Sequence, residues 1–193
     1  FEMVELKFAV QAPIFVARQW FRHRTGSYNE QSGRYSKLND LFYMPEVARS
    51  QHKTNKQMSG DEVLVDDIQQ RFANYLAKSI GQYGEYSELC DLGVAREQAR
   101  MGLSMNLYTK FYFKIDLHNF LNFAKLRMAP DAQYEIRVYA NAMFDMVKQI
   151  CPVTCDAFLN AGQSVTLTAQ ECEELKHVHE GGALLPESVL KKL

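Results

Sequence analysis

Residues 107–115 alternate apolar and polar side chains in the pattern of a β-strand, Leu107-Tyr108-Thr109-Lys110-Phe111-Tyr112-Phe113-Lys114-Ile115. A period of two places neighbouring side chains on opposite faces, so this strand is expected to bury one face and expose the other. Asp116 follows at once and can cap a helix that continues to about Met128. The stretch therefore predicts a strand that leads directly into a helix, as in a fold of helices packed on a sheet.

The start of the chain shows the same alternation, with large apolar side chains at every second position from Val4 to Val10. Pro13 then stands near the first turn of a short helix. The other elements expected up to residue 60 are a helix over 14–21, a structured loop over 25–40, a short strand over 41–44 and a polar, mobile segment over 46–60.

The rest of the chain predicts mainly helices. Ser59 or Asp61 is expected to cap a long helix, and its apolar stripe consists of Leu64, Ile68, Phe72, Tyr75, Leu76, Ile80 and Tyr83. Further helices are expected over 95–101 and from Pro130 or Asp131 to Ile150. The order of elements predicts an α+β fold, a single domain over residues 1–160 with helices packed on a mostly antiparallel sheet. Residues 161–193 are expected to form a C-terminal tail.

Composition excludes several classes of protein. The chain has 193 residues, of which 47% are hydrophobic, and a formal net charge of −1. The small net charge argues against a protein that coats nucleic acid. No apolar run approaches the roughly 20 residues that span a membrane, and no signal peptide is visible. The four cysteines fit neither a common zinc pattern nor a disulfide scaffold, so we expect no metal and a reduced, cytoplasmic protein.

Positive charge is concentrated between Pro13 and Lys37, where four arginines and one lysine face a single glutamate. Guanidinium groups match the geometry of phosphate oxygens. Interleaved Gly, Ser and Asn residues supply backbone N–H groups and let the chain approach a ligand closely. The segment therefore predicts a site for a small phosphorylated ligand.

Three more segments carry polar residues at the expected ends of elements. Arg96 and Arg100 are four residues apart on one helix, and Arg127 stands at a helix end, where it can also serve the helix dipole. Asp116, His118, Asn119 and Asn122 cluster at the start of the helix that Asp116 caps.

Arg22-His23-Arg24, followed by seven residues and Ser32, resembles the signature of flavin-dependent thymidylate synthases. The resemblance continues through residues 12–21, 33–36, 106–109 and 122–127, and covers about residues 1–160. It implies a homotetramer that binds FAD at subunit junctions, with active sites shared between subunits. It also implies methylation of dUMP to dTMP, with methylenetetrahydrofolate as the carbon donor and NADPH as the source of the hydride.

The resemblance also implies roles for single residues. The residues that it places against FAD are Arg22, His23, Arg24, Glu30, Asp116, Leu117, His118 and Asn122. Those that it places around dUMP are Gln19, Trp20, Phe21, Arg22, Glu30, Gln31, Ser32, Gly33, Arg34 and Arg100. Arg127 matches the arginine that polarises the uracil ring, where it would stabilise negative charge.

The sequence departs from the family pattern at two places. Asp116-Leu117-His118 stands where the family usually has Asn-x-Arg, and a carboxylate is unfavourable beside FAD phosphates. The contact there is therefore expected to involve ribose or adenine. The family's histidine-containing segment that touches FAD is expected before Phe1.

Alternatives remain open from the residues alone. Arg22, Arg24 and Arg34 with nearby tyrosines could bind single-stranded nucleic acid, although the modest net charge makes us expect no nucleic-acid partner. The chain could also bind FAD without methyl transfer. Ser32 is interpreted as a hydrogen-bond donor rather than a nucleophile, His23 as a neutral imidazole beside two arginines, and Arg96 as a surface charge. His177 and His179 are assigned to a solvated tail, and none of the cysteines is expected to be catalytic.

Overall fold

The computed structural model describes residues 1–162, 167–173 and 175. They fall into two compact units, the first comprising Phe1–Met143 and the second beginning at Phe144. The predicted boundary at residue 160, between the family domain and the C-terminal tail, stays a prediction. Everything that bears on the candidate site lies in the first unit.

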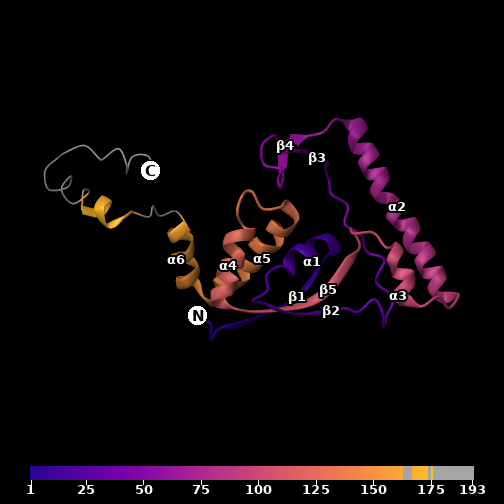
Figure 1. The fold of residues 1–193 in the computed structure, drawn as a ribbon, viewed down its shortest axis with the longest axis horizontal. Helices are drawn as coiled ribbons and strands as arrows, with labels where there is room; N and C mark the ends of the chain where they lie inside the picture. The colour runs from indigo at the N-terminus through magenta and orange to yellow at the C-terminus, as the bar shows by residue number, and fades with distance from the viewer. Residues whose placement is uncertain (163–166, 174, 176–193) are drawn as a thin grey trace. The chain divides into compact units, whose positions relative to one another are not determined.

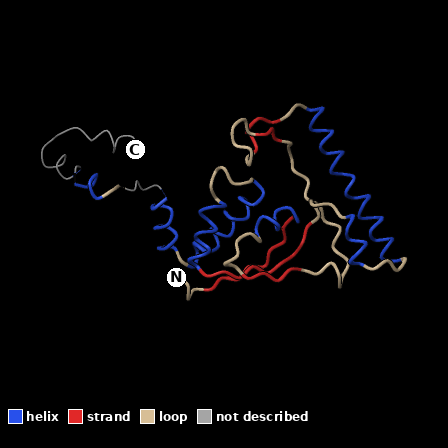
Figure 2. Tube along the Cα trace, viewed as in Figure 1, coloured by secondary structure: helices blue, strands red, loops and turns tan. Residues whose placement is uncertain are grey.

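The sheet of the first unit has the strand order β1-β5-β2 and is antiparallel throughout. β1 (Glu5–Pro13) runs the full length of β5 (Tyr108–Asp116), with Glu5 opposite Asp116 and Pro13 opposite Tyr108. The short strand β2 (Ser27–Glu30) pairs with the other side of β5. The strands lie side by side in Figure 1 and Figure 2. The predicted α+β class with a mostly antiparallel sheet is thereby confirmed.

Two helices cover the buried face of β5. α1 (Ile14–Trp20) and α4 (Leu117–Arg127) meet at Trp20, which is completely buried. Its indole ring lies 5.6 Å from the ring of Phe113 on β5 and 5.2 Å from the ring of Phe123 on α4. The alternation of residues 107–115 accounts for this layer, because every second side chain of β5 from Thr109 to Ile115 is buried.

The remaining elements surround this layer, and their bounds follow in chain order. They are β3 (Arg49–Gln51), β4 (Ser59–Val63), α2 (Asp66–Asp91), α3 (Arg96–Ala99), the short 3₁₀-helix η1 (Arg100–Gly102), α5 (Tyr134–Ile150) and α6 (Pro152–Gly162). α5 continues from the first unit into the second, and α6 belongs to the second.

The short polar strands were not predicted. β2 lies inside the expected loop over 25–40, and β3 and β4 pair with each other in and just beyond the expected mobile segment over 46–60. The expected strand over 41–44 is only a single bridge between Phe42 and Leu107. These polar segments become strands because a partner strand accepts their backbone hydrogen bonds, which the side-chain pattern does not reveal.

The starts of α2 and α5 differ from the prediction, whereas the start of α4 confirms it. Ser59 belongs to β4, so neither it nor Asp61 caps α2, which begins at Asp66 after Val65. α5 begins at Tyr134 rather than at Pro130 or Asp131. At α4 the prediction is confirmed, since the Asp116 carboxylate accepts the Asn119 N–H at 2.9 Å. The predicted stripe of α2 is only partly buried, because Tyr75 and Ile80 remain mostly exposed.

Candidate active site

The arginine-rich turn after α1 is held by backbone and tyrosine hydrogen bonds. The N–H of His23 donates to the Trp20 carbonyl at 3.0 Å, and the N–H of Gly26 donates to the His23 carbonyl at 3.2 Å. The hydroxyl of Tyr28 lies 3.1 Å from the Trp20 carbonyl oxygen and 2.9 Å from that of His23. Burial of this hydroxyl raises the pKa of Tyr28 to about 12. The turn is therefore a fixed platform rather than a loose loop.

Gly26 allows this turn to lie against the sheet. A Cβ atom at this position would come within 2.4 Å of Cε2 of Phe113. The absence of a side chain thus lets the turn touch the central aromatic ring of β5. Arg22 and Arg24 are exposed, whereas His23 is half-buried.

His23 and Arg127 meet across the end of α4. Arg127 Nε donates a hydrogen bond to His23 Nε2 at 2.9 Å, and the imidazole packs against the ring of Phe123 at 4.9 Å. Burial, and secondarily the charge of Arg127, lower the pKa of His23 from 6.5 to about 4. His23 is therefore neutral, as predicted, but the cause is burial and Arg127 rather than the adjacent Arg22 and Arg24. Burial also lowers the pKa of Arg127.

Residues 32–38 follow β2 and include residues that the family resemblance predicts to bind dUMP, so we call them the substrate loop. The N–H groups of Tyr35 and Ser36 both donate to the Ser32 carbonyl at 3.3 Å, and the Arg34 N–H donates to Ser32 Oγ at 3.2 Å. A Cβ atom on Gly33 would lie 3.3 Å from Cδ of Arg100. The structure thus brings the loop beside Arg100, from a segment about 65 residues away in sequence.

Two residues of α3 also hold the substrate loop. Arg96 donates to the Tyr35 carbonyl at 2.9 Å, so it is not only a surface charge but also restrains the loop. Glu97 pairs with Arg34 at 3.2 Å, with both side chains more than half exposed. An ion pair that exposed is worth about 1 kcal/mol or less, so it can yield to a stronger acceptor for Arg34.

Glu30 and Gln31 lie at the end of β2, next to the loop. The buried hydroxyl of Thr109 donates to Glu30 Oε1 at 2.7 Å, which orients an otherwise exposed carboxylate. Gln31 donates its backbone N–H to the Lys110 carbonyl at 2.8 Å. β5 therefore fixes the direction in which Glu30 leaves the sheet.

The predicted substrate segment Gln19–Phe21 is mostly internal. Trp20 forms the core described above, and Phe21 packs on the ring of Tyr28 at 4.8 Å. Gln19 Oε1 and Trp20 Nε1 are buried and have no hydrogen-bond partner in the part of the chain that the structure describes. Unpaired buried polar atoms are rare in proteins. Both of these atoms lie at the end of α1, directly before the arginine-rich turn.

The residues at the start of α4 lie far from the pair at its end. The Asp116 carboxylate accepts from Asn119 through both its N–H and its side-chain amide, at 2.9 and 2.7 Å. Leu117 is buried, while His118 and Asn122 are exposed. With 11 residues in α4, Asp116 and Arg127 are roughly 16 Å apart. A single chain thus divides the residues predicted to bind FAD into two groups.

Comparison with known proteins identifies the family. The family model described as thymidylate synthase complementing protein matches residues 1–153. The chain belongs to this family of flavin-dependent thymidylate synthases. The match confirms the family resemblance that residues 22–36 carry.

Curated relatives bear the name of the family. The flavin-dependent thymidylate synthase of Thermus thermophilus is 55% identical over 160 residues, covering 82% of this chain and 57% of the relative. That of Dictyostelium discoideum is 46% identical over 179 residues, covering 91% of this chain and 59% of the relative. The chain thus spans less than two thirds of the length of these relatives.

A solved structure has a similar fold. The UMP/dUMP methylase PolB from Streptomyces cacaoi, bound with 5-Br UMP, has a TM-score of 0.73 and 31% identity. The similarity covers 81% of this chain and 73% of PolB.

Several residues of this family member that shape the site were not predicted as site residues. They are Tyr28, Thr109, Tyr83, Tyr86 and Lys37, which act through backbone atoms or through other side chains. Tyr83 was assigned only to an apolar stripe. Their shared signal, a hydroxyl or an ammonium group on an otherwise apolar or helical face, is weak because such groups are common.

The described residues offer neither a metal site nor a membrane-spanning helix. No three His, Cys, Asp or Glu side chains in residues 1–162, 167–173 and 175 gather where they could hold a metal ion, and His177 and His179 lie outside these ranges. In the same ranges, no helix combines the length and the apolar character needed to cross a bilayer.

Proposed function

We propose that the protein carrying this chain converts dUMP to dTMP, with methylenetetrahydrofolate as the carbon donor and NADPH as the hydride source through FAD. Membership of the family and the names of the relatives support this proposal. The observation that carries it is the contact between Arg127 and His23, which places a guanidinium group beside the arginine-rich turn.

Arg127 is the residue that would act on the uracil ring. Its contact with His23 uses Nε, so the two terminal nitrogens can face another acceptor. C5 of uracil is a poor nucleophile, and donors on a ring oxygen would stabilise the negative charge that develops when C5 attacks. Because His23 is neutral, it orients the guanidinium without cancelling its charge.

The substrate loop would bind the phosphate of dUMP. Ser32 Oγ already accepts the Arg34 N–H, so its hydroxyl proton is available for a phosphate oxygen. Gly33 leaves room for close approach of the backbone, and Arg100 lies directly beside it. Arg34 would exchange its exposed partner Glu97 for the phosphate, a stronger acceptor with more charge.

The residues present fit a flavin dinucleotide. Arg22 and Arg24 are exposed cations that suit a diphosphate. His118 offers a donor near the start of α4, and Asn122 offers one in the middle of that helix. The Asp116 carboxylate accepts two hydrogen bonds from Asn119 and keeps its negative charge, so ribose or adenine rather than a phosphate would lie beside it. FAD supplies the hydride chemistry when bound.

The separation of the two groups also bears on assembly. Roughly 16 Å between the ends of α4 suits an extended dinucleotide, or sites completed by a neighbouring subunit. We therefore retain the homotetramer with shared active sites as part of the proposal, along with a cytoplasmic location.

A visible spectrum of the purified full-length protein tests the proposal. We expect flavin absorption bands that NADPH bleaches and air restores, and formation of dTMP when dUMP and methylenetetrahydrofolate are added. A colourless protein that cannot be loaded with FAD but retards oligonucleotides would support the nucleic-acid binder instead. Flavin bands without any dTMP would indicate an FAD protein that has lost methyl transfer.

A further inference from the structure

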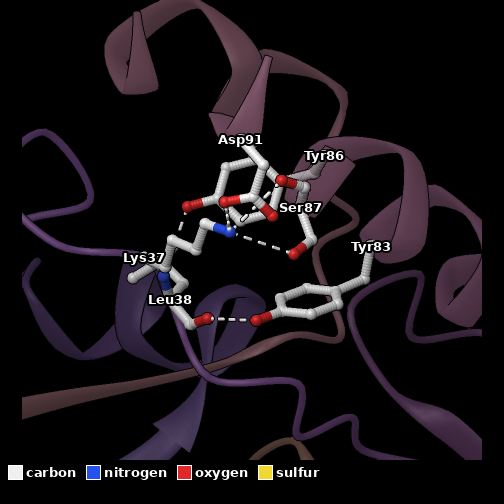
Figure 3. A network of polar contacts seen from close by, with 6 residues as sticks. All are labelled: Lys37, Leu38, Tyr83, Tyr86, Ser87 and Asp91. Carbon is white, nitrogen blue, oxygen red and sulfur yellow. Dashed lines mark hydrogen bonds and ion pairs between the residues drawn. The ribbon is translucent and has the colours of Figure 1, made fainter. Parts of the chain in front are cut away.

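α2 holds the C-terminal end of the substrate loop through hydrogen bonds of Tyr83 and Tyr86 with Leu38, which we call the grip. The hydroxyl of Tyr83 donates to the Leu38 carbonyl at 2.6 Å, and the Leu38 N–H donates to the hydroxyl of Tyr86 at 3.3 Å (Figure 3). Tyr83 and Tyr86 are three residues apart on the helix, so both hydroxyls reach the same residue of the loop. Both backbone polar groups of Leu38 are therefore fixed by tyrosines.

This grip is internal to the molecule. Leu38 is 8% exposed and Tyr86 only 2% exposed. The rings of Tyr83 and Tyr86 lie 5.5 Å apart, and the ring of Phe42 packs edge-on against Tyr83 at 6.0 Å. Because the rings are packed, the hydroxyl groups have little freedom to follow a displaced loop.

Lys37 adds a second attachment at the surface. Its ammonium donates to Asp91 Oδ1 at 2.6 Å and to the carbonyl and hydroxyl oxygens of Ser87 at 3.2 Å each (Figure 3). The Asp91 side chain is 71% exposed, so solvent screens this pair. The tyrosine contacts to Leu38 are the stronger restraint.

The grip reaches the residues that would bind phosphate. A Cβ atom on Gly33 would lie 3.3 Å from Cδ1 of Leu38 and 3.3 Å from Cδ of Arg100. Gly33 is thus enclosed between Leu38 and Arg100. A shift of Leu38 would move Gly33, and with it the Ser32 hydroxyl and the Arg34 N–H on either side.

We propose that Tyr83 and Tyr86 are positioning residues that set the affinity of the substrate loop for the phosphate of dUMP, an inference that rests on the proposed function. They act through the Leu38 peptide and touch neither the substrate nor the flavin. Arg127 stands on α4 and is held by His23, so the chemistry at the uracil ring is independent of this grip. The tyrosines therefore affect phosphate binding and leave the methylation step unchanged.

The test compares Tyr83→Phe and Tyr86→Phe in the full-length, FAD-loaded protein, with Tyr75→Phe as the matched control on the exposed side of α2. Dissociation constants for dUMP and for deoxyuridine, which lacks the phosphate, are measured by calorimetry together with kcat at saturating dUMP. We expect each variant to weaken dUMP binding about tenfold, the effect of losing one well-placed hydrogen bond. Deoxyuridine binding, kcat and the control should stay within about twofold of wild type.

Equal weakening of dUMP and deoxyuridine would overturn the inference, because it would show a general structural role. Unchanged dUMP binding in both variants would overturn the inference as well. If the wild-type protein binds dUMP in that case, the proposed function still stands. A wild-type protein that binds no dUMP contradicts the proposed function itself. Lys37→Met, which removes the surface attachment without touching the core, should show the same selectivity at about threefold and serves if a tyrosine variant does not fold.

Discussion

Arg127 donates from Nε to Nε2 of His23 at 2.9 Å, although the two residues are 104 positions apart. An imidazole nitrogen that accepts a hydrogen bond carries no proton, so the proton of neutral His23 is on Nδ1. The contact joins the end of α4 to the turn after α1. A neutral acceptor fixes the direction of the guanidinium and leaves its positive charge available, which a carboxylate partner would not do.

Removal of Arg127 tests its role at the uracil ring. Arg127→Ala is expected to lower dTMP formation by at least about 100-fold, the effect of losing one preorganised donor, while NADPH still reduces the flavin at a near-normal rate. Arg127→Lys keeps a charge but loses the planar fork, and should recover only part of the activity. Stopped-flow flavin reduction and dTMP assays separate the two steps. Near-normal dTMP formation by Arg127→Ala would show that the assigned role is wrong.

Substitutions of His23 test whether a neutral acceptor orients Arg127. His23→Gln keeps an acceptor near the position of Nε2, whereas His23→Leu has a similar bulk and no acceptor. We expect His23→Leu to lower kcat for dTMP by about tenfold or more relative to His23→Gln, at equal FAD content, because one hydrogen bond is lost. Equal activities of the two variants would show that the contact does not matter for turnover.

The depressed pKa of His23 predicts a pH dependence of stability. NMR titration of the imidazole should give a value of about 4, set first by burial and then by Arg127. Between about 4 and 6.5 the unfolded chain binds more protons than the folded one, so the free energy of unfolding falls as pH decreases through this window. His23→Gln removes this proton uptake and should show a shallower loss between pH 7 and 5. A titration near 6.5 would contradict the buried contact.

Glu97→Gln tests whether Arg34 is shared between α3 and the substrate. The variant removes the ion pair at 3.2 Å and leaves Arg34 free for phosphate. Because the pair is exposed and weak, we expect only a two- to threefold decrease in KM for dUMP, with kcat unchanged. Glu88→Gln, an exposed position on α2, provides the control. An increase in KM would mean that Glu97 helps to place Arg34 rather than competing for it.

Gly26→Ala tests the close approach of the turn to the sheet. The new Cβ would come within 2.4 Å of Phe113, whose ring is confined by Trp20 at 5.6 Å and Phe123 at 5.7 Å. Overpacking of this kind should lower the free energy of unfolding by about 1–3 kcal/mol. Gly81→Ala in the open middle of α2 meets nothing within 4 Å and should raise stability by up to about 1 kcal/mol. Chemical denaturation of both variants gives the two signs.

Local patterns in the sequence predict the elements whose signal is local. The alternation of residues 107–115 and the capping carboxylate of Asp116 suffice to place β5 and the start of α4. β2 and the pair β3 and β4 escape prediction because they are short and polar, and their strand conformation depends on a partner strand. The predicted start of α2 was wrong for the same reason, because Ser59 is part of strand β4.

The site divides in the same way. Family resemblance points to His23, Gly33, Arg100 and Arg127, and the structure shows that each has a neighbour in this set. The supporting residues are beyond such reasoning, because Thr109 and Tyr86 gain their importance only from contacts formed on folding. The neutral state of His23 was predicted, but its cause is a partner 104 residues away.

A crystal structure of the full-length protein with FAD and dUMP is the most direct test of the account. We predict that the phosphate is bound by Ser32, Arg34 and Arg100, and that the terminal nitrogens of Arg127 contact the uracil ring beside the flavin. A complex in which dUMP lies away from residues 32–38, or in which its ring makes no contact with Arg127, would contradict the account.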